Sequence, residues 1–315
     1  MTQAGSYIVR ELLGESLIIA RDATHTLRGF FNVCRHRGSR VCDRDGHGSR
    51  LVCPYHAWSY RLDGTFGGAL GLPDTVDRTT LGLKPVQLAE VAAQRNYPTA
   101  GNWKLVLENF IECYHCIPAH AEYCRVMKHV DVVAREDAAA TAAWQGQIEL
   151  WSREKAARES PLAVNPSVLQ SAVCRAARAP IGGDRQTQSE NGLPVAPLMG
   201  QLAQFDGGVS AFRCEPFIFL AALNDHAVLF HSSPIDAEHT DVGITWLVDG
   251  NADDSQVDID RMTWLWDVTT RQDKVLIERN GAGVRSRAYG PGPYSRLESL
   301  PARFIARYLG ELGRM

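Results

Sequence analysis

The first 66 residues contain short stretches in which apolar and polar residues alternate. A period of two is typical of β-strands, and the turns between these stretches are rich in glycine. The expected strands are residues 7–9, 16–20, 27–33, 50–52 and 59–62. Together they predict a small antiparallel β-domain at the N-terminus.

The pattern changes after this region. Residues 67–100 are rich in Gly, Pro, Asp and Thr and predict an irregular connection, with a strand over 83–91. Asn102 is expected to cap a helix that begins at Trp103. Residues 131–178 are rich in Ala and Arg, and their pattern does not decide between helix and strand.

The C-terminal half contains clearer signals. Residues 179–208 predict a long loop, and a loop of that length inside a compact domain tends to be functional or disordered. Three strands are expected after it, at 210–223, 227–232 and 243–248, with a turn at Asn224-Asp225. Residues 258–280 predict one long helix ended by Gly281 and Gly283. The whole pattern indicates an α+β chain.

Composition narrows the functional classes. The chain has 315 residues, enough for one large or two smaller domains, with 45% hydrophobic and 22% charged residues. A net charge of −3 gives no reason to expect nucleic acid or an anionic membrane as a partner. Neither a membrane-spanning stretch nor a secretory signal is visible. Eight cysteines without a signal predict reduced thiols and a cytoplasmic location.

Two short motifs, 16 residues apart, each pair one cysteine with one histidine: Cys34-Arg35-His36 and Cys53-Pro54-Tyr55-His56. Two histidines that replace two thiolates on one iron of a [2Fe–2S] cluster define the Rieske centre. The alternative is a Cys₂His₂ zinc site, which usually presents a cysteine pair and then a histidine pair. The order of the ligands therefore favours a Rieske cluster.

These loops, extended to Gly38 and Trp58, resemble the cluster-binding loops of Rieske non-haem iron oxygenase α subunits. The resemblance implies that Cys34 and Cys53 bind one iron. It also implies that His36 and His56 bind the other.

A second group of potential ligands lies at residues 108–120. A non-haem iron(II) oxygenase holds its metal with two histidines and one carboxylate and leaves positions open for O₂ and substrate. His115 and His120 are five residues apart, which is not a same-face spacing on a regular helix. Because Pro118 cannot continue the hydrogen-bond ladder, we expect the helix to end near Cys116 and His120 to turn back beside His115. Such a pair alone is more often surface or core, but the flanking residues again resemble the oxygenase family.

The third ligand must come from elsewhere in the chain. The long C-terminal helix offers three candidate carboxylates: Asp267, Asp273 and Glu278. The segment 270–280 resembles the family segment that completes the iron triad, and this resemblance places the ligand at Asp273. The family more often has an acidic residue just before the ligand; here it is Gln272, a departure that does not touch the ligand itself.

Asn109 and Glu112 are further candidate catalytic residues. Glu112 precedes His115 by about one helical turn, so both side chains should point the same way. In many members of the family an aspartate at this place bridges a Rieske histidine of one subunit to an iron-binding histidine of the next. A subset that oxidises quaternary amines and carnitine-like compounds has glutamate there. The alternative is that Glu112 only orients His115 as a hydrogen-bond acceptor.

The resemblance covers nearly the whole chain and implies its organisation. Residues 1–83 would form a Rieske [2Fe–2S] domain, and residues 84–315 a catalytic domain whose twisted antiparallel sheet surrounds a long C-terminal helix. Mononuclear Fe(II) would use O₂ and electrons from the cluster.

Gly281-Ala282-Gly283 follows a helix and is not a dinucleotide loop, so a separate NAD(P)H-dependent flavin or iron–sulfur reductase is implied. The family is usually a homotrimer. Its members generally have several dozen residues before the first Rieske strand, whereas this sequence starts almost on that strand. This difference from the family bears on the trimer contact.

The substrate is the least constrained property. Residues 286–295 and 245–248 look most like the branch that demethylates glycine betaine and related compounds by hydroxylating an N-methyl group. Aromatic residues that could bind a trimethylammonium group are Phe212, Phe217, Phe219, Phe230 and Trp246. Phenylalanines that alternate in strands are more often core residues. The alternatives are a hydroxylase of an aromatic or natural-product substrate and, less favoured by the chain length, a Rieske electron-transfer protein.

Overall fold

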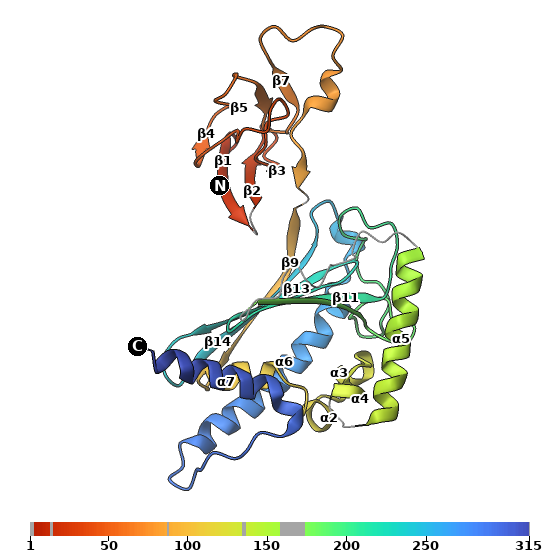
Figure 1. Ribbon diagram of the computed structural model, residues 1–315, viewed down its shortest axis with the longest axis vertical. Coiled ribbons are helices and arrows are strands. Elements are labelled where there is room, and N and C mark those ends of the chain that lie inside the picture. Colours follow the sequence, from red (N-terminus) through yellow and green to blue (C-terminus); the bar gives the residue numbers. More distant parts are fainter. Residues whose placement is uncertain (1–2, 13–14, 87, 134–136, 158–173, 315) are drawn as a thin grey trace. The chain divides into compact units, whose positions relative to one another are not determined.

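The computed structural model describes residues 3–12, 15–86, 88–133, 137–157 and 174–314. The chain divides into two compact units, Met1–Ala89 and Glu90–Met315, whereas the sequence predicts a boundary after residue 83 (Figure 1). Each unit has its own hydrophobic core. Among the described residues, no helix has both the length and the apolar character needed to cross a membrane.

The N-terminal unit consists of two small β-sheets. One has the strand order β4-β1-β2-β3-β8 and the other β5-β6-β7. The strands are β1 (Ser6–Leu12), β2 (Glu15–Arg21), β3 (Leu27–Phe31), β4 (Gly46–His47), β5 (Arg50–Val52), β6 (Ser59–Arg61), β7 (Phe66–Gly68) and β8 (Pro85–Val86), with a 3₁₀ turn at Arg78–Leu81. All five predicted strands are present, and the short strands β4 and β7 were not predicted.

The C-terminal unit is built around a six-stranded antiparallel sheet of order β10-β11-β12-β13-β14-β9. Its strands are β9 (Ala89–Thr99), β10 (Cys174–Pro180), β11 (Gly208–Cys214), β12 (Ile218–Ala222), β13 (Ala227–Pro234) and β14 (Thr240–Asp249). Its helices are α1 (Trp103–Phe110), α2 (Cys116–Ala119), α3 (Ala121–Val126), α4 (Val130–Val133), α5 (Ala138–Ala157), α6 (Ile259–Val284) and α7 (Ser299–Leu312), with 3₁₀ turns at Asp254–Gln256 and Arg296–Glu298. The predicted α+β class, with an antiparallel sheet and a long helix near the C-terminus, is confirmed.

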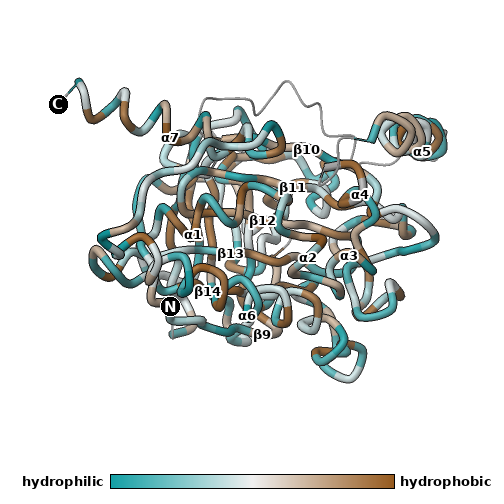
Figure 2. Tube along the Cα trace, turned by 90° about the horizontal axis from the view of Figure 1, so that it is seen from below, coloured by the Kyte–Doolittle hydropathy of each residue, from teal (hydrophilic) through white to brown (hydrophobic). Residues whose placement is uncertain are grey.

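The main core lies between one face of this sheet and α6. Trp246 and Ile244 on the sheet and Met262 and Leu265 on the helix are fully buried in one cluster. Helix α5 lies at the periphery of this unit in both views (Figure 1 and Figure 2). The buried face of α6 therefore fixes the helix that carries Asp273.

Several predicted boundaries are wrong, each for a local reason. The predicted strand 210–223 is interrupted between β11 and β12 at Pro216, which lacks the N–H that a central strand donates. The long helix continues past Gly281 to Val284. Gly281 does not end it but allows close packing, since a Cβ there would lie 3.0 Å from the carbonyl oxygen of Ala100. Strand β9 extends through residues predicted to be irregular, and α7 was not predicted.

The expectation of eight reduced thiols is also wrong. The structure contains disulfides between Cys113 and Cys116 and between Cys174 and Cys214. The free cysteines are Cys34, Cys42, Cys53 and Cys124. The thiols of both Cys–His motifs are therefore available as ligands.

The predicted long loop is present between β10 and β11, and it is ordered by buried polar contacts. Asp225, in the turn between β12 and β13, accepts hydrogen bonds from the hydroxyl of Thr187 (2.6 Å) and the N–H of Val195 (3.0 Å). Gln188, on the same loop, accepts the indole N–H of Trp266 on α6 (3.0 Å). The loop therefore connects the β12–β13 turn to the long helix.

Candidate metal centres and the adjoining cavity

The two Cys–His motifs of the N-terminal unit have the same backbone closure. The N–H of Gly38 donates to the carbonyl of Cys34, and the N–H of Ala57 donates to the carbonyl of Cys53, both at 3.0 Å. In each loop the cysteine N–H also donates, at 2.8 Å, to the carbonyl five residues later. Gly38 and Ala57 both have positive φ, 76° and 55°. One loop geometry is thus used twice.

The side chains of these loops divide into buried thiols and exposed imidazoles. Cys34 and Cys53 are only 3% and 2% exposed, whereas His36 and His56 are exposed. The two imidazole rings lie 4.7 Å apart, and His36 stacks on Trp58. The loops therefore place the two cysteines on the core side and the two histidines on the solvent side.

Tyr60 on β6 is a neighbour of the cluster loops that sequence reasoning missed. Its hydroxyl accepts the N–H of Arg35 (2.9 Å) and lies 3.1 Å from Cys34 Sγ. Burial and the Cys34 contact raise the pKa of Tyr60, so its hydroxyl keeps its proton and can donate to the sulfur. An apolar strand position after the second motif is the only sequence signal that marks this residue.

The positions of the four Cys and His side chains in these loops can be compared with those that a single zinc ion requires. A single zinc ion needs ligand atoms that converge on one point. In the described part of the chain, the group of His, Cys, Asp and Glu side chains that converges in this way is His115, His120 and Asp273, within 4.8 Å. The four loop side chains do not form such a group. The division into two buried thiols and two exposed imidazoles is the one expected for a cluster in which cysteines and histidines bind different irons.

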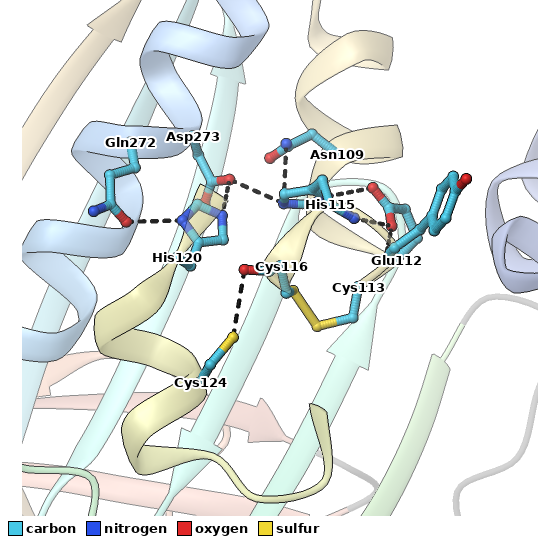
Figure 3. The surroundings of a disulfide bond; sticks show 10 residues. Asn109, Glu112, Cys113, His115, Cys116, His120, Cys124, Gln272 and Asp273 are labelled. Atoms are coloured by element: carbon cyan, nitrogen blue, oxygen red, sulfur yellow. Dashed lines mark hydrogen bonds and ion pairs between the residues drawn. A yellow bond between two sulfur atoms is a disulfide. The ribbon is translucent and has the colours of Figure 1, made fainter. Parts of the chain in front are cut away.

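The C-terminal unit brings together the three side chains predicted as a triad (Figure 3). Asp273 Oδ1 on α6 lies 3.0 Å from His120 Nε2 and 3.3 Å from His115 Nε2. The other two candidate carboxylates of α6 are engaged elsewhere: Asp267 with Tyr97, Arg95 and Arg271, and Glu278 with Lys274 and the N–H of Ala100. Among the three candidates, Asp273 is the one placed beside the histidines.

The route of the backbone differs from the prediction. Helix α1 ends at Phe110 instead of near Cys116. The Glu112 carboxylate accepts the N–H groups of Tyr114 and His115, which replaces the helical ladder there. Pro118 lies inside the first turn of α2, where a missing N–H is tolerated. His120 follows α2, and its ring centroid is 5.1 Å from that of His115, so the predicted pairing of the two histidines is present.

Each histidine of the triad is held through its other ring nitrogen. Nδ1 of His115 contacts Glu112 Oε1, and Nδ1 of His120 lies 2.8 Å from Gln272 Oε1. Gln272 in turn donates its amide to Glu122 (2.9 Å). An acceptor at Nδ1 leaves Nε2 of each ring as the free ligand atom. Gln272, which sequence reasoning set aside, is therefore a direct neighbour of the site.

The protonation behaviour of His115 and Asp273 indicates that this site favours a positive charge. Burial alone would lower the pKa of His115, but hydrogen bonds to Asp273 and Glu112 raise it to about 9. Burial would raise the pKa of Asp273, yet the two histidines hold it below its ordinary value. Without metal the site thus favours a proton between its two carboxylates, and a divalent cation can replace that proton. Two imidazoles and a carboxylate suit iron(II).

Asn109 is the remaining predicted residue. Its amide nitrogen lies 3.4 Å from His115 Nε2, and its Oδ1 is buried without a hydrogen-bond partner among the described residues. An unsatisfied buried oxygen beside the ligand atoms is the place where a bound group would be accommodated.

A cavity of about 90 Å³ adjoins the triad. Its aromatic wall consists of Phe110, Tyr123, Phe219 and Trp266, and its polar wall includes Asn109, Thr269 and Arg213. Of the five predicted aromatic residues only Phe219 lines this cavity. Trp246 is fully buried in the core, and Phe217 and Phe230 line a neighbouring hollow that shares Phe219. The helical positions of Phe110, Tyr123 and Trp266 gave no sign that they would meet here.

Comparisons with known proteins agree in the family they indicate. Residues 87–311 match the family described as ring hydroxylating alpha subunit (catalytic domain), and residues 1–77 match the Rieske [2Fe-2S] domain. The glycine betaine monooxygenase oxygenase subunit of Chromohalobacter salexigens is 32% identical over 93% of this chain and 74% of its own length. The corresponding subunit of Pseudomonas aeruginosa is 32% identical over 93% of this chain and 76% of its own length. The carnitine monooxygenase oxygenase subunit of Escherichia coli is 30% identical over 38% of this chain and 43% of its own length.

Proposed function

The chain belongs to the Rieske non-haem iron oxygenase α subunits, and from that premise we propose that it hydroxylates an N-methyl group of a betaine or related quaternary amine. The observation that carries the proposal is the convergence of His115, His120 and Asp273 beside an aromatic-walled cavity. The similarity to glycine betaine monooxygenase oxygenase subunits over most of the chain supports the substrate class.

We assign the metal ligands residue by residue. Cys34, His36, Cys53 and His56 would hold the [2Fe–2S] cluster, and His115, His120 and Asp273 would hold iron(II). When bound, the cluster supplies electrons one at a time and the iron supplies the reactivity toward O₂.

The surrounding residues would prepare this site. Glu112 and Gln272 keep the two imidazoles in the tautomer and orientation that present Nε2. Asn109 would orient a group beside His115. In a homotrimer Glu112 would also bridge to a cluster histidine of the neighbouring subunit, a role that stays a prediction beside its contact with His115.

The proposed reaction balances with an external reductant. O₂, two electrons and two protons convert an N–CH₃ group to N–CH₂OH and one water. The N–CH₂OH group then loses formaldehyde, and its hydroxyl proton moves to the nitrogen. An oxygenase subunit of this kind implies a reductase partner, and we propose an NAD(P)H-dependent flavin or iron–sulfur protein in that role.

The aromatic wall supports a cationic substrate. Phe110, Phe219 and Trp266 line the cavity, and a trimethylammonium group is attracted to the face of such a ring by about 0.5–2 kcal/mol. The second candidate is hydroxylation of an aromatic or natural-product substrate, which the same apolar wall would also accommodate.

A substrate screen tests the proposal. The purified protein, loaded with iron and supplied with a surrogate reductase, is incubated with betaines and with aromatic acids while O₂ uptake and formaldehyde are measured. We expect one formaldehyde per O₂ with at least one betaine. O₂ uptake coupled to a hydroxylated aromatic product, without formaldehyde, would support the second candidate instead.

Iron analysis separates the oxygenase from a simple electron carrier. About three irons per chain are expected for one cluster and one mononuclear site, whereas two would indicate a carrier. A single zinc ion would contradict both. The His115→Ala variant serves as the inactive control in the screen.

A further inference from the structure

Arg213 on β11 is a cationic side chain in the wall of the cavity that adjoins the iron triad. It lies on the face of the sheet that forms the core: in the strand register it is opposite Phe219, and Phe219 is opposite Phe230. Its guanidinium carbon is 5.7 Å from the centre of the Phe219 ring. A charged residue therefore adjoins the apolar pair Phe219 and Phe230 in this row.

The guanidinium of Arg213 has no hydrogen bond or ion pair with any residue that the structure describes. The charge of the Glu215 carboxylate acts on Arg213, but that carboxylate forms its ion pair with Arg307, at 2.7 Å. Burial lowers the pKa of Arg213, because the apolar wall solvates the charged guanidinium less well than water does. Arg213 is half-buried and lines the cavity, and a charge in such an apolar wall is normally paired, so the side chain is placed to bind an anion there.

The strand register adds a second cation. Arg175 on β10 is directly opposite Arg213, on the same face of the sheet. Like charges at directly opposed positions destabilise a strand pair. An anion bound at Arg213 would offset this repulsion.

We propose that Arg213 binds a carboxylate of the substrate, so that the natural substrate is an amino-acid betaine and not a simple quaternary amine. The trimethylammonium group would lie against Phe110 and Trp266 near the triad, with the carboxylate held by Arg213 on the sheet side. A guanidinium binds a carboxylate through two parallel hydrogen bonds, which fixes the direction of the substrate as well as its affinity. The substrate class rests on the proposed function, whereas the anion preference rests on Arg213 alone.

The test compares two substrates that differ in the carboxylate. Glycine betaine and choline share the trimethylammonium group, but choline carries a neutral hydroxymethyl group in place of the carboxylate. Binding of each to the oxidised, iron-loaded protein is measured by calorimetry, and formaldehyde release gives kcat and KM. The variants are Arg213→Gln and Arg213→Lys. The control is Arg125→Gln, an arginine stacked on the Trp264 ring outside the cavity.

Loss of one charged hydrogen-bonding partner should weaken glycine betaine binding and raise its KM by about 10- to 100-fold. Choline binding should change little, Arg213→Lys should recover part of the loss, and Arg125→Gln should behave as wild type. Visible absorbance and iron content confirm that the variants are folded and loaded. Equal weakening of both compounds, or no change for glycine betaine, would overturn the role of Arg213. Absence of formaldehyde from every N-methyl compound would refute the proposed function, while the binding comparison would still decide on Arg213.

Discussion

The two candidate metal centres are held in different ways. The cluster loops lie within one short stretch and are closed by their own backbone hydrogen bonds, with both histidines exposed. The triad joins His120 to a residue 153 positions later, and His120 is 1% exposed. Its imidazoles depend on side chains from other segments, Glu112 and Gln272. The first site is therefore local, whereas the second depends on the packing of the whole catalytic unit.

The largest effects are expected where a ligand of one site is removed. His115→Ala should abolish turnover and leave the visible absorbance of the Rieske cluster intact. Cys53→Ala should remove that absorbance and leave the mononuclear iron in place. Spectra and iron content measured on both variants check the comparison. Loss of the cluster absorbance in His115→Ala would mean that the two sites are not independent.

Two carboxylates on one helix test the assignment of the third ligand. If Asp273 is the third ligand, Asp273→Ala should weaken iron(II) binding by more than about 100-fold, which is more than the loss of a residue that only orients a ligand. Asp267→Ala is the matched control, since Asp267 pairs with Tyr97 and Arg95 instead of the histidines. Iron content after dialysis is the measurement. Equal loss of iron from both variants would contradict the choice of Asp273.

The difference between the sites explains what the sequence could predict. Cys34, His36, Cys53 and His56 could be predicted as ligands because each loop carries its cysteine, its histidine and its turn residue within a few positions. The strands after the long loop and helix α6 were expected from their patterns, and the antiparallel sheet of the catalytic unit was expected from the family resemblance. Gln272, Tyr60 and the cavity residues Phe110, Tyr123 and Trp266 were missed, because their roles arise from contacts between segments that no periodicity records. The end of α1 was missed because the Glu112 side chain competes with the helical ladder.

The buried turn at Asp225 tests whether the catalytic unit depends on distant packing. Asp225→Asn should lower the free energy of unfolding by about 3 kcal/mol, since it breaks the fully buried Asp225–His226 pair and the contacts of the long loop. Burial would raise the pKa of Asp225, but His226, Thr187 and the Val195 N–H hold it below its ordinary value. The carboxylate therefore contributes stability above about pH 4 and loses it in more acidic solution.

Thermal unfolding measured between pH 3 and 7 checks this prediction. The control is Asp236→Asn, because Asp236 pairs with His239 at the same 2.9 Å but is exposed. The cluster absorbance should not change at neutral pH. A loss of stability equal in the two variants would show that burial of the pair is not the cause.

A smaller effect is expected from Gln272. Gln272→Leu removes the acceptor at His120 Nδ1 and should weaken iron(II) binding by about 10- to 100-fold. Gln272→Glu keeps an acceptor for His120 Nδ1 but replaces the amide donor to Glu122 with a carboxylate, so it should recover only part of the affinity. Titration with a chelator measures the affinity without reference to turnover. Unchanged affinity in Gln272→Leu would mean that packing alone orients His120.

The smallest effect concerns the cluster unit, where the hydroxyl of Tyr60 contacts the sulfur of the proposed ligand Cys34. Tyr60→Phe removes the hydroxyl 3.1 Å from Cys34 Sγ. Hydrogen bonds to the sulfurs raise the reduction potential of an iron–sulfur cluster, so the potential should fall by a few tens of millivolts while the absorbance remains. Tyr55→Phe is the matched control, because Tyr55 is exposed and packs on His56 only through its ring. Redox titration of both variants measures the reduction potential of the cluster. Equal potentials in Tyr60→Phe and wild type would mean that the Tyr60 hydroxyl does not affect the cluster. The loops alone would then set its potential, and the cluster site would be wholly local.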